Sequence, residues 1–528
     1  MRILIFVFFT VFSIPNEINQ LNERIRQKVE KLPISRALNS QYEIYCIPSI
    51  REVYLNNEFN PFWTNEYQVN DLISILKQCQ DEGLKPENYH LPEIMEVRIE
   101  NSEESRANLD IILTDAFLLY ISHILSGKTN PETIDSEWHV LKTNKNPVKY
   151  LYALNERSIS EVIDEIKPKN KNYEALQAQL KYYRALENED GLEEIPTGQL
   201  IKPGMTDYRI PMIREALSFS KDLPTEQLSA NNTYDDSLKM GILRYQKRHG
   251  LEALGNIGNQ TIEMLNISPA ERIKTIIVNL ERLRWLPQEV PDYYMMVNIV
   301  NFELDVVENN FITQNHKVIV GKEYRKTPVF SSALQYLVFN PTWTIPPTIL
   351  KNDVIPEVRK NPSYLAQKNI FVYNKQGVKL NVDSIDWTSS DVYSFTYRQE
   401  PGKTNALGTV KFMFPNNFNV YLHDTPAKEL FEKTERAFSS GCIRVHKPLE
   451  LAEYLLRGQS GYSLSEIKRI VETSKTKTVI LNRKPEVYLI YLTTWINDSG
   501  QLNFRKDIYN RDERVYNALQ DNPVYDLQ

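Results

Sequence analysis

The chain has 528 residues, which is too long for one hydrophobic core, so its length predicts two to four domains. Hydrophobic residues make up 41% and charged residues 25%, a composition typical of globular proteins rather than disordered or fibrous ones. The net charge of −6 argues against nucleic acid as a main partner, because no basic excess is available to neutralise phosphates.

The N-terminal residues 1–14 have the pattern of an export signal. A charged start at Arg2 is followed by an apolar run from Ile3 to Ile14, and polar residues come next. This run is shorter than the roughly 20 apolar residues that a membrane-spanning helix needs. We therefore expect an exported protein, in which residues 1–14 form either a cleaved signal peptide or an uncleaved anchor.

Residues 40–202 have the pattern of a helical scaffold domain, which we extend to residues 268–289. Apolar side chains recur at helical spacing from Leu72 to Cys79, and Asn70 is placed to cap that helix. Cys79 lies on the apolar stripe, so we expect it to be a small core residue. A longer stripe from Leu109 to Ile124 repeats the pattern.

A change in composition near residues 195–205 marks a linker, and short helices joined by glycine turns follow it. Residues 203–267 resemble the small three-helix peptidoglycan-binding module, with the turn at Gly255–Gly258. His249 shares a helix face with Leu238 and Ile242, so we expect it to be structural. The alternative is that this module only packs against the scaffold.

After Tyr293 the sequence changes to short alternating segments, among them residues 293–309 and 418–424, which are typical of β-strands. Residues 290–515 are therefore predicted to form a mainly β, sandwich-like domain, and the whole chain a multidomain α+β protein. The irregular, aromatic-rich residues 346–400 interrupt these strands, as a lid does. Residues 516–528 remain as a C-terminal tail.

Cys442 is one of three cysteines, and it lies in a turn of small polar residues. A nucleophilic cysteine acts as the thiolate, so it needs a base nearby. His423 ends a strand-like run and can point toward the turn, whereas His446 leads into a predicted helix and is expected to be peripheral. Main-chain N–H groups around Ser440 and Gly441 are placed to form an oxyanion hole.

Two other interpretations of Cys442 compete with the nucleophile. His423, Cys442 and His446 are possible zinc ligands, but no paired cysteine or histidine motif accompanies them. A buried, inert cysteine would have apolar neighbours, and the neighbours of Cys442 are small and polar. We expect no metal and no organic cofactor. Arg444 either holds a substrate carboxylate or pins the loop.

The sequences "HDTP" at His423–Pro426 and "SSGCIRV" at Ser439–Val445 resemble the active-site signature of L,D-transpeptidases with a YkuD-type catalytic domain. Segments at 281–287, 340–350, 401–416 and 504–514 resemble the large periplasmic subfamily, and those at 81–91 and 113–128 resemble its scaffold domain. Many family members have histidine directly before the Gly-Cys pair. The large subfamily resembles this chain in having serine there, which places the role of base on His423.

The resemblance implies acyl transfer that forms 3→3 cross-links in peptidoglycan. Cys442 attacks a tetrapeptide stem and releases D-alanine, and an amine of a second stem resolves the thioester, with His423 as base and acid. Hydrolysis of stems by an L,D-carboxypeptidase or endopeptidase is the alternative within the same chemistry. A non-catalytic wall-binding protein is a further alternative, although it would not need Cys442 and His423.

The resemblance also implies where the protein works and what it binds. We expect a periplasmic protein, associated with the membrane at most through its N-terminus, whose partners are donor and acceptor stem peptides and glycan. Carbapenems are expected to acylate Cys442 and not Cys46 or Cys79. We expect the substrate to be bound by Arg444, Tyr421, Ser439, Trp343 and Asn405.

Overall fold

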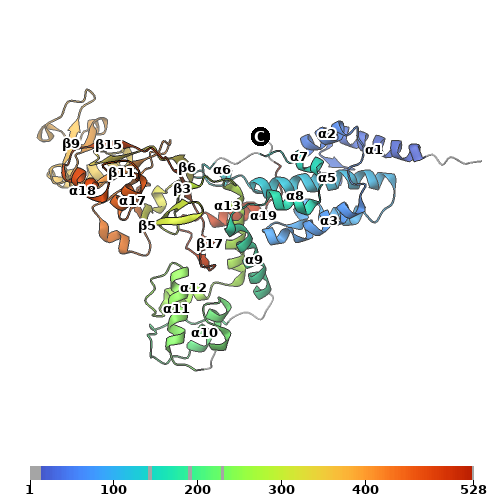
Figure 1. The fold of residues 1–528 in the computed structure, drawn as a ribbon, viewed down its shortest axis with the longest axis horizontal. Coiled ribbons are helices and arrows are strands. Elements are labelled where there is room, and N and C mark those ends of the chain that lie inside the picture. Colours follow the sequence, from blue (N-terminus) through green and yellow to red (C-terminus); the bar gives the residue numbers. More distant parts are fainter. Residues whose placement is uncertain (1–13, 141–144, 188–192, 228–230, 526–528) are drawn as a thin grey trace, which may run out of the picture.

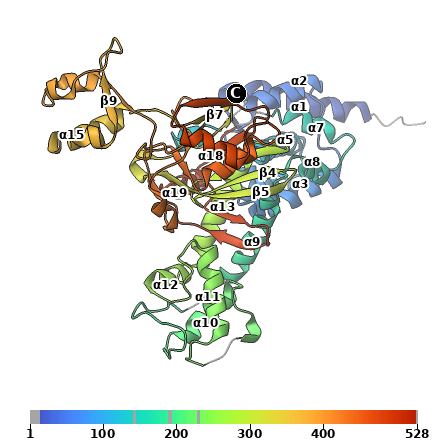
Figure 2. The ribbon, with the colours of Figure 1, turned by 60° about the vertical axis from the view of Figure 1, so that its left-hand side comes forward.

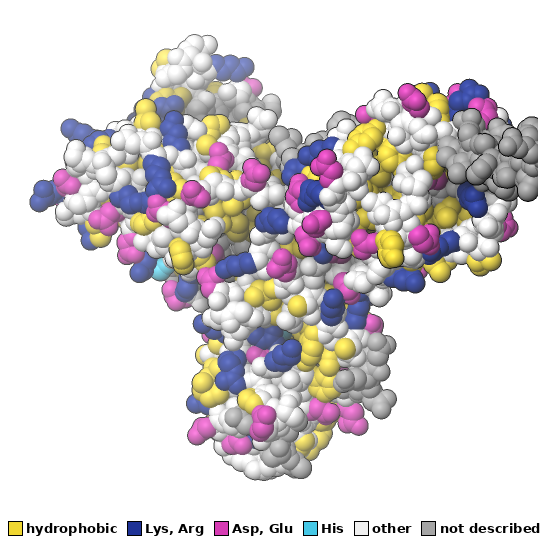
Figure 3. Space-filling view, turned by 45° about the vertical axis from the view of Figure 1, so that its right-hand side comes forward, with side chains coloured by type: hydrophobic (Ala, Val, Ile, Leu, Met, Phe, Trp, Pro, Cys, Tyr) yellow, Lys and Arg dark blue, Asp and Glu magenta, His cyan; other side chains and the backbone are white. Residues whose placement is uncertain are grey.

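The computed structural model describes residues 14–140, 145–187, 193–227 and 231–525, so the predicted export signal lies, up to residue 13, outside the described residues. Three lobes meet at helix α13 (Pro269–Trp285): a helical lobe, a small helical module and a mainly β domain (Figure 1). The expected multidomain α+β fold is confirmed. On the face drawn in Figure 3, acidic and basic side chains are interspersed rather than gathered by sign.

The helical lobe surrounds one buried helix, α5. This helix, Glu103–Ser126, is long and apolar enough to cross a membrane. However, 94% of its most apolar 18-residue stretch is buried inside the protein. The lobe consists of α1 (Ile14–Ser35), α2 (Ile47–Asn56), α3 (Glu66–Gln78), α4 (Leu91–Val97), α5 (Glu103–Ser126), α6 (Pro131–Ile134), α7 (Val148–Ala153) and α8 (Ile159–Ile166), with a short β1–β2 pair (Ala37–Leu38, Tyr42–Glu43). α5 is therefore the core helix of this lobe.

Helix α3 begins earlier than its sequence pattern predicts. The Asn65 side chain accepts a hydrogen bond from the Tyr67 N–H and caps the helix, so Asn70 lies inside it and not at its start. The helical stripe itself is confirmed, because Leu72, Leu76 and Cys79 are buried. Cys46 and Cys79 are both buried and free.

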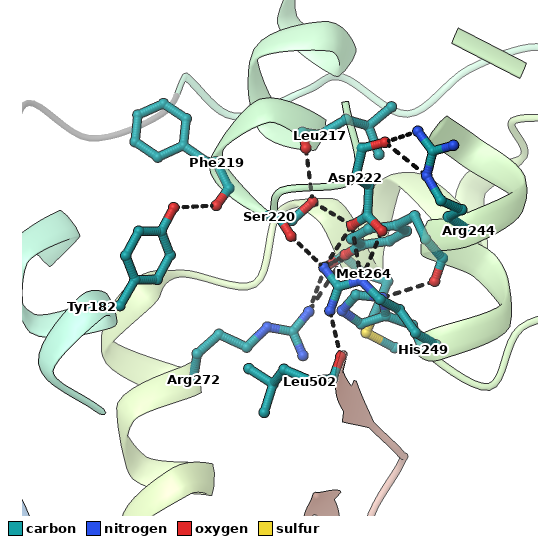
Figure 4. Close-up of polar contacts among 12 residues, drawn as sticks. Tyr182, Leu217, Phe219, Ser220, Asp222, Arg244, His249, Met264, Arg272 and Leu502 are labelled. Atoms are coloured by element: carbon teal, nitrogen blue, oxygen red, sulfur yellow. Dashed lines mark hydrogen bonds and ion pairs between the residues drawn. The ribbon is translucent and has the colours of Figure 1, made fainter. Parts of the chain in front are cut away.

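The small module has a hydrophobic core of its own, built on α10 (Ile210–Phe219), α11 (Asp236–Arg248) and α12 (Asn259–Leu265). That core begins at Ile195, within the predicted linker. The module also contacts the β domain: Arg248, paired with Asp222, donates to the Leu502 carbonyl (Figure 4). His249 is buried as expected.

Helices α9 (Lys171–Glu187) and α13 pack together and join the three lobes. Their shared core includes Tyr173 and Ile276 from the helices, and Ile490 and Phe504 from strands of the β domain. The small module is therefore attached to elements of both the helical lobe and the β domain (Figure 1).

The β domain is built on one curled sheet, in the order β15-β7-β11-β12-β14-β5-β4-β3-β16-β6, with β13 paired to β5. Helices α17 (Pro448–Leu455) and α18 (Leu464–Glu472) pack beside it. The strands are β3 (Tyr293–Asn298), β4 (Glu303–Glu308), β5 (Phe311–Gly321), β6 (Phe330–Ala333), β7 (Tyr336–Phe339), β11 (Val410–Met413), β12 (Leu422–His423), β13 (Ala437–Ser439), β14 (Ile443–Val445), β15 (Lys477–Ile480) and β16 (Glu486–Ile490). A separate hairpin joins β17 (Thr494–Ile496) to β18 (Leu502–Phe504).

The region predicted to be an irregular lid is a folded subdomain. It has its own sheet, in the order β8-β10-β9, and its own core, which includes Ile355, Val372 and Tyr397. Its elements are β8 (Trp343–Thr344), α14 (Pro347–Ile349), a π-helical turn (Leu350–Val354), α15 (Ile355–Lys360), α16 (Tyr364–Gln367), β9 (Ile370–Tyr373) and β10 (Thr396–Gln399). Figure 2 shows it projecting from the sheet. Its role as a lid stays a prediction.

The C-terminal segment returns to the helical lobe instead of ending as a free tail. Residue 516, the predicted start of the tail, lies inside α19 (Asp512–Gln520). At the end of this helix, the Lys128 ammonium donates to the carbonyls of Leu519 and Asp521, and farther on the Tyr525 hydroxyl bonds to Ser49.

Candidate active site

Three neighbouring strands of the large sheet bring the candidate residues onto one face. In the register of β11, β12 and β14, Lys411 lies opposite His423, and His423 lies opposite Arg444. Side chains alternate between the faces of a sheet, so these three share a face. The intervening Phe412, Leu422 and Ile443 are buried in the core, and this burial determines which face turns outward.

Cys442 directly precedes β14 and lies beside Tyr421, the residue before β12. The Ile443 N–H donates to the Tyr421 carbonyl at 3.1 Å, which continues the strand pairing as far as these residues. By alternation Cys442 and Tyr421 share the face of His423 and Arg444. The structure thus brings the predicted nucleophile and base together.

The proton positions on His423 follow from its hydrogen bond. Nδ1 lies 2.5 Å from the main-chain oxygen of Asp424, and a carbonyl can only accept, so Nδ1 carries the proton and Nε2 keeps its lone pair. Burial and the neighbouring Arg444 charge together lower the pKa of His423 to about 3, although the hydrogen bond to Asp424 opposes the shift. His423 is therefore neutral at physiological pH and able to accept a proton.

The Cys442 thiol is partly exposed and is not an anion at neutral pH. Burial raises its pKa, while hydrogen bonds from Tyr421 and the charges of Arg444 and Lys411 oppose the shift. The thiol donates to the Asn419 carbonyl at 3.5 Å, so its proton is not shared with His423 here. Catalytic hydrogen bonds of this kind often form only when substrate is bound.

The loop before Cys442 is held in shape by hydrogen bonds among its own residues. The Ser439 hydroxyl donates to the Cys442 carbonyl at 2.5 Å and accepts from the Gly441 N–H at 3.1 Å. Gly441 has φ +113, which favours glycine, and its carbonyl accepts from the Thr327 hydroxyl at 2.8 Å. The Gly441 N–H, predicted to serve the oxyanion hole, is thus engaged by Ser439.

Two residues predicted to bind substrate are buried and hydrogen-bonded within the protein. Ser439 is a buried brace of the loop and does not line the outer face. Asn405 is fully buried: its amide donates at 3.0 Å to the carbonyls of Pro341 and Glu400, and its oxygen accepts from the Leu407 N–H. It therefore ties together the two ends of the inserted subdomain. A side chain with its polar atoms satisfied internally is not available to a ligand.

The other residues predicted to bind substrate lie around the thiol. Burial raises the pKa of Tyr421 and the neighbouring Cys442 raises it further, while a hydrogen bond from Trp343 opposes the shift. Trp343, in β8, thus brings the inserted subdomain to the site. Within the described part of the chain, Arg444 Nε is buried without a partner, so this guanidinium can accept a carboxylate.

His446 lies away from the thiol. It is separated from Cys442 by β14, and the four-residue step from Cys442 to His446 spans about 13 Å of extended chain. Its ring contacts that of Phe431 at 5.2 Å. Cys442 and His446 are too far apart to bind one zinc ion, and the described residues contain no group of three or more potential metal ligands.

Two residues at this site were missed in the sequence, Lys411 and Asp424. Asp424 is buried, and its carboxylate accepts from the N–H and hydroxyl of Thr409 at 2.8 and 2.7 Å, which holds the chain next to His423. Its position directly after His423 in the motif was the available signal. Lys411 was signalled by its place between apolar residues of an alternating strand.

An open cavity of about 810 Å³ begins at Ser440. The Ser440 hydroxyl accepts from Arg325 at 2.8 Å, and Arg325 also pairs with Asp353 of the inserted subdomain at 2.7 Å. The lining carries charges of both signs, with Arg325, Lys326 and Arg514 beside Asp135, Glu137, Glu323 and Asp353.

Two family models match the chain. Residues 292–478 match the L,D-transpeptidase catalytic domain (YkuD), and residues 48–180 match a scaffold domain. A protein of Haemophilus influenzae named "Putative L,D-transpeptidase" is 34% identical over 243 residues, which are 46% of this chain and 48% of that protein. The chain thus matches about half the length of this relative.

The comparison with solved structures found L,D-transpeptidases at low sequence identity and low TM-score. The structure from Stackebrandtia nassauensis is 14% identical, and the match covers 56% of this chain and 96% of that one with a TM-score of 0.22. The structure from Xylanimonas cellulosilytica is 12% identical and covers 56% and 99%, with a TM-score of 0.18.

Proposed function

We propose that the chain forms 3→3 cross-links in peptidoglycan through Cys442, because residues 292–478 match the L,D-transpeptidase catalytic domain (YkuD) and residues 48–180 match a scaffold domain. The observation that carries the proposal is the placement of a partly exposed thiol and a neutral imidazole on one face of neighbouring strands. The free lone pair on His423 Nε2 is the group that a protonated thiol requires.

The proposed reaction has two halves. His423 takes the proton of Cys442, and the sulfur attacks the carbonyl carbon of the third residue of a tetrapeptide stem. The C–N bond to D-alanine breaks, His423 returns the proton to the departing amine, and a thioester remains. In the second half His423 takes a proton from the amine of another stem, which attacks the thioester. The C–S bond breaks, the new amide forms, and the sulfur regains its proton.

The surroundings of the site support a peptide substrate. Stem peptides carry both carboxylates and amines, and the cavity beside Ser440 is lined with side chains of both charges. Arg444 is placed to bind a stem carboxylate next to the sulfur. Because peptidoglycan lies outside the cytoplasmic membrane, the proposal includes export to the periplasm, with residues 1–14 as signal or anchor and the small module as a binder of glycan.

The test is product analysis with purified tetrapeptide muropeptides and the full chain. Mass spectrometry should show cross-linked dimers and released D-alanine with the unchanged protein, and neither with Cys442→Ala. Tripeptide monomers alone would identify a hydrolase, and unchanged substrate would identify a wall-binding protein. Dimers formed by Cys442→Ala would overturn the mechanism. Thermal unfolding of both proteins should show that the substitution leaves the fold intact.

A further inference from the structure

Lys411 lies at the active site in a position where keeping its ammonium group charged costs free energy. It comes from β11, between the buried Val410 and Phe412, and its side chain is half-buried on the face of the nucleophile. Burial lowers the pKa of Lys411, and the group that opposes this shift is the Cys442 thiolate. The charge of Lys411 is thus stabilised in the protein by an anion that exists only when Cys442 is deprotonated.

Tyr421 connects the two residues. The Lys411 ammonium lies 5.6 Å from the centre of the Tyr421 ring, within the range of a cation–π contact. The Tyr421 side chain in turn lowers the pKa of Cys442, which favours the thiolate. A cation over the ring helps to hold the tyrosine in place beside the sulfur.

The histidine does not supply the positive charge that a thiolate needs. His423 lies between Lys411 and Arg444 in the strand register, and both cations disfavour its protonated form. The charged and titratable groups on the face of the sulfur are Lys411 from β11, Tyr421 directly before β12, His423 from β12 and Arg444 from β14, with Glu429 beside Arg444. The cations that face the sulfur are therefore Lys411 and Arg444.

We propose that Lys411 is a positioning residue that stabilises the Cys442 thiolate, through its charge and through its hold on Tyr421. This role rests on the proposed function, because the thiolate is the nucleophile of the proposed transfer. His423 then moves protons, while Lys411 and Arg444 are the counter-charges of the sulfur. This arrangement differs from a thiolate–imidazolium pair, in which one histidine both accepts the proton and supplies the positive charge.

The pH dependence of alkylation by iodoacetamide tests this without any substrate. Cys46 and Cys79 are fully buried, so the label reports Cys442. In the unchanged protein the rate should rise with pH and reach half its maximum at a higher pH than for a free cysteine, since the thiol pKa is raised by burial. Lys411→Met should move this midpoint up by about 1 pH unit, because a neighbouring cation is lost, and lower the rate at neutral pH about tenfold.

Matched variants separate this role from a general effect on the fold. Lys411→Arg should restore the midpoint. Lys477→Met removes another lysine from above a tyrosine ring, that of Tyr462, at the edge of the same sheet, and should leave the midpoint unchanged. In the double variant Lys411→Met/Tyr421→Phe the shift should be smaller than the sum of the single shifts, because the two residues act together.

An unchanged midpoint in folded Lys411→Met would overturn the proposal, and so would a failure of Lys411→Arg to restore a shifted one. If Lys411→Met unfolds, Lys411→Gln is measured in its place. The outcome is independent of the proposed function: a protein that makes no cross-links at all would still report the influence of Lys411 on its thiol.

Discussion

At the scale of single residues, the protonation of His423 determines what the site can do. Its Nδ1 proton is held by a main-chain carbonyl, which has no titration of its own, so the free Nε2 is maintained over the whole physiological range. His446, on the same segment of the sequence, lacks this arrangement: its own carbonyl accepts a hydrogen bond from His316, and its ring lies against Phe431.

We predict that His423→Ala lowers the rate of Cys442 acylation by a carbapenem about 10²–10⁴-fold, the usual contribution of a positioned base. His446→Asn should lower it less than about threefold, because β14 carries this residue away from the sulfur. Stopped-flow or mass-spectrometric acylation rates decide the matter. If His446→Asn were inactive and His423→Ala active, His446 and not His423 would be the base.

At the scale of elements, the loop before β11 supports the histidine. Gly408 has φ +61, and a Cβ atom added there would overlap the carboxyl group of Asp424. Asp424 is held by Thr409 and by Lys428, and its main-chain oxygen orients the His423 ring. A change at Gly408 is therefore transmitted to the base through one neighbouring residue.

Gly408→Ala should destabilise the protein by about 1–3 kcal/mol and slow acylation of Cys442, because both the backbone conformation and the Asp424 contact are disturbed. Gly458→Ala is the matched control: Gly458 has φ +84 but nothing within 4 Å of an added Cβ. It should cost about 1 kcal/mol and leave acylation unchanged. Thermal unfolding and acylation rates are measured on both. Equal effects of the two substitutions on acylation would exclude the contact with Asp424 as the cause.

At the scale of the whole molecule, the inserted subdomain joins the catalytic domain through few elements. Its first and last strands pair with each other, Trp343 opposite Gln399, and Asn405 closes the base. Because its core is its own, removing it exposes little of the main core. Trp343 and the Arg325–Asp353 pair nevertheless place it beside the sulfur and its loop.

Replacing residues 345–397 by a two-residue turn between β8 and β10 should leave the catalytic domain folded. We predict that transfer between stems falls at least about tenfold, whereas acylation by a small carbapenem changes little, because the inhibitor needs less of the substrate-binding surface. Product analysis and acylation rates on the same preparation test this. If both rates fell equally in a folded protein, the subdomain would be part of the catalytic core and not a cover for the substrate.

The sequence by itself determined the elements whose pattern is local. Helical and alternating periodicities predicted the helical scaffold and the β domain, because each depends on residues close together in the chain. Cys442, Gly441 and Arg444 form one contiguous motif, and the alternation before His423 placed this residue at the end of a strand. The nucleophile and its base could therefore be proposed without a structure.

Only the tertiary structure decided which side chains meet. Lys411 joins the site through the pairing of β11 with β12, and alternation within a strand specifies a face but not its neighbour. The polar side chains of Ser439 and Asn405 are equally suited to a ligand or to a loop, and here internal carbonyls and N–H groups satisfy them. Asn65 and Asn70 are equally good caps, and the packing of the apolar stripe selected Asn65. In each case the outcome depends on partners distant in sequence or on the competition for hydrogen bonds in the folded chain.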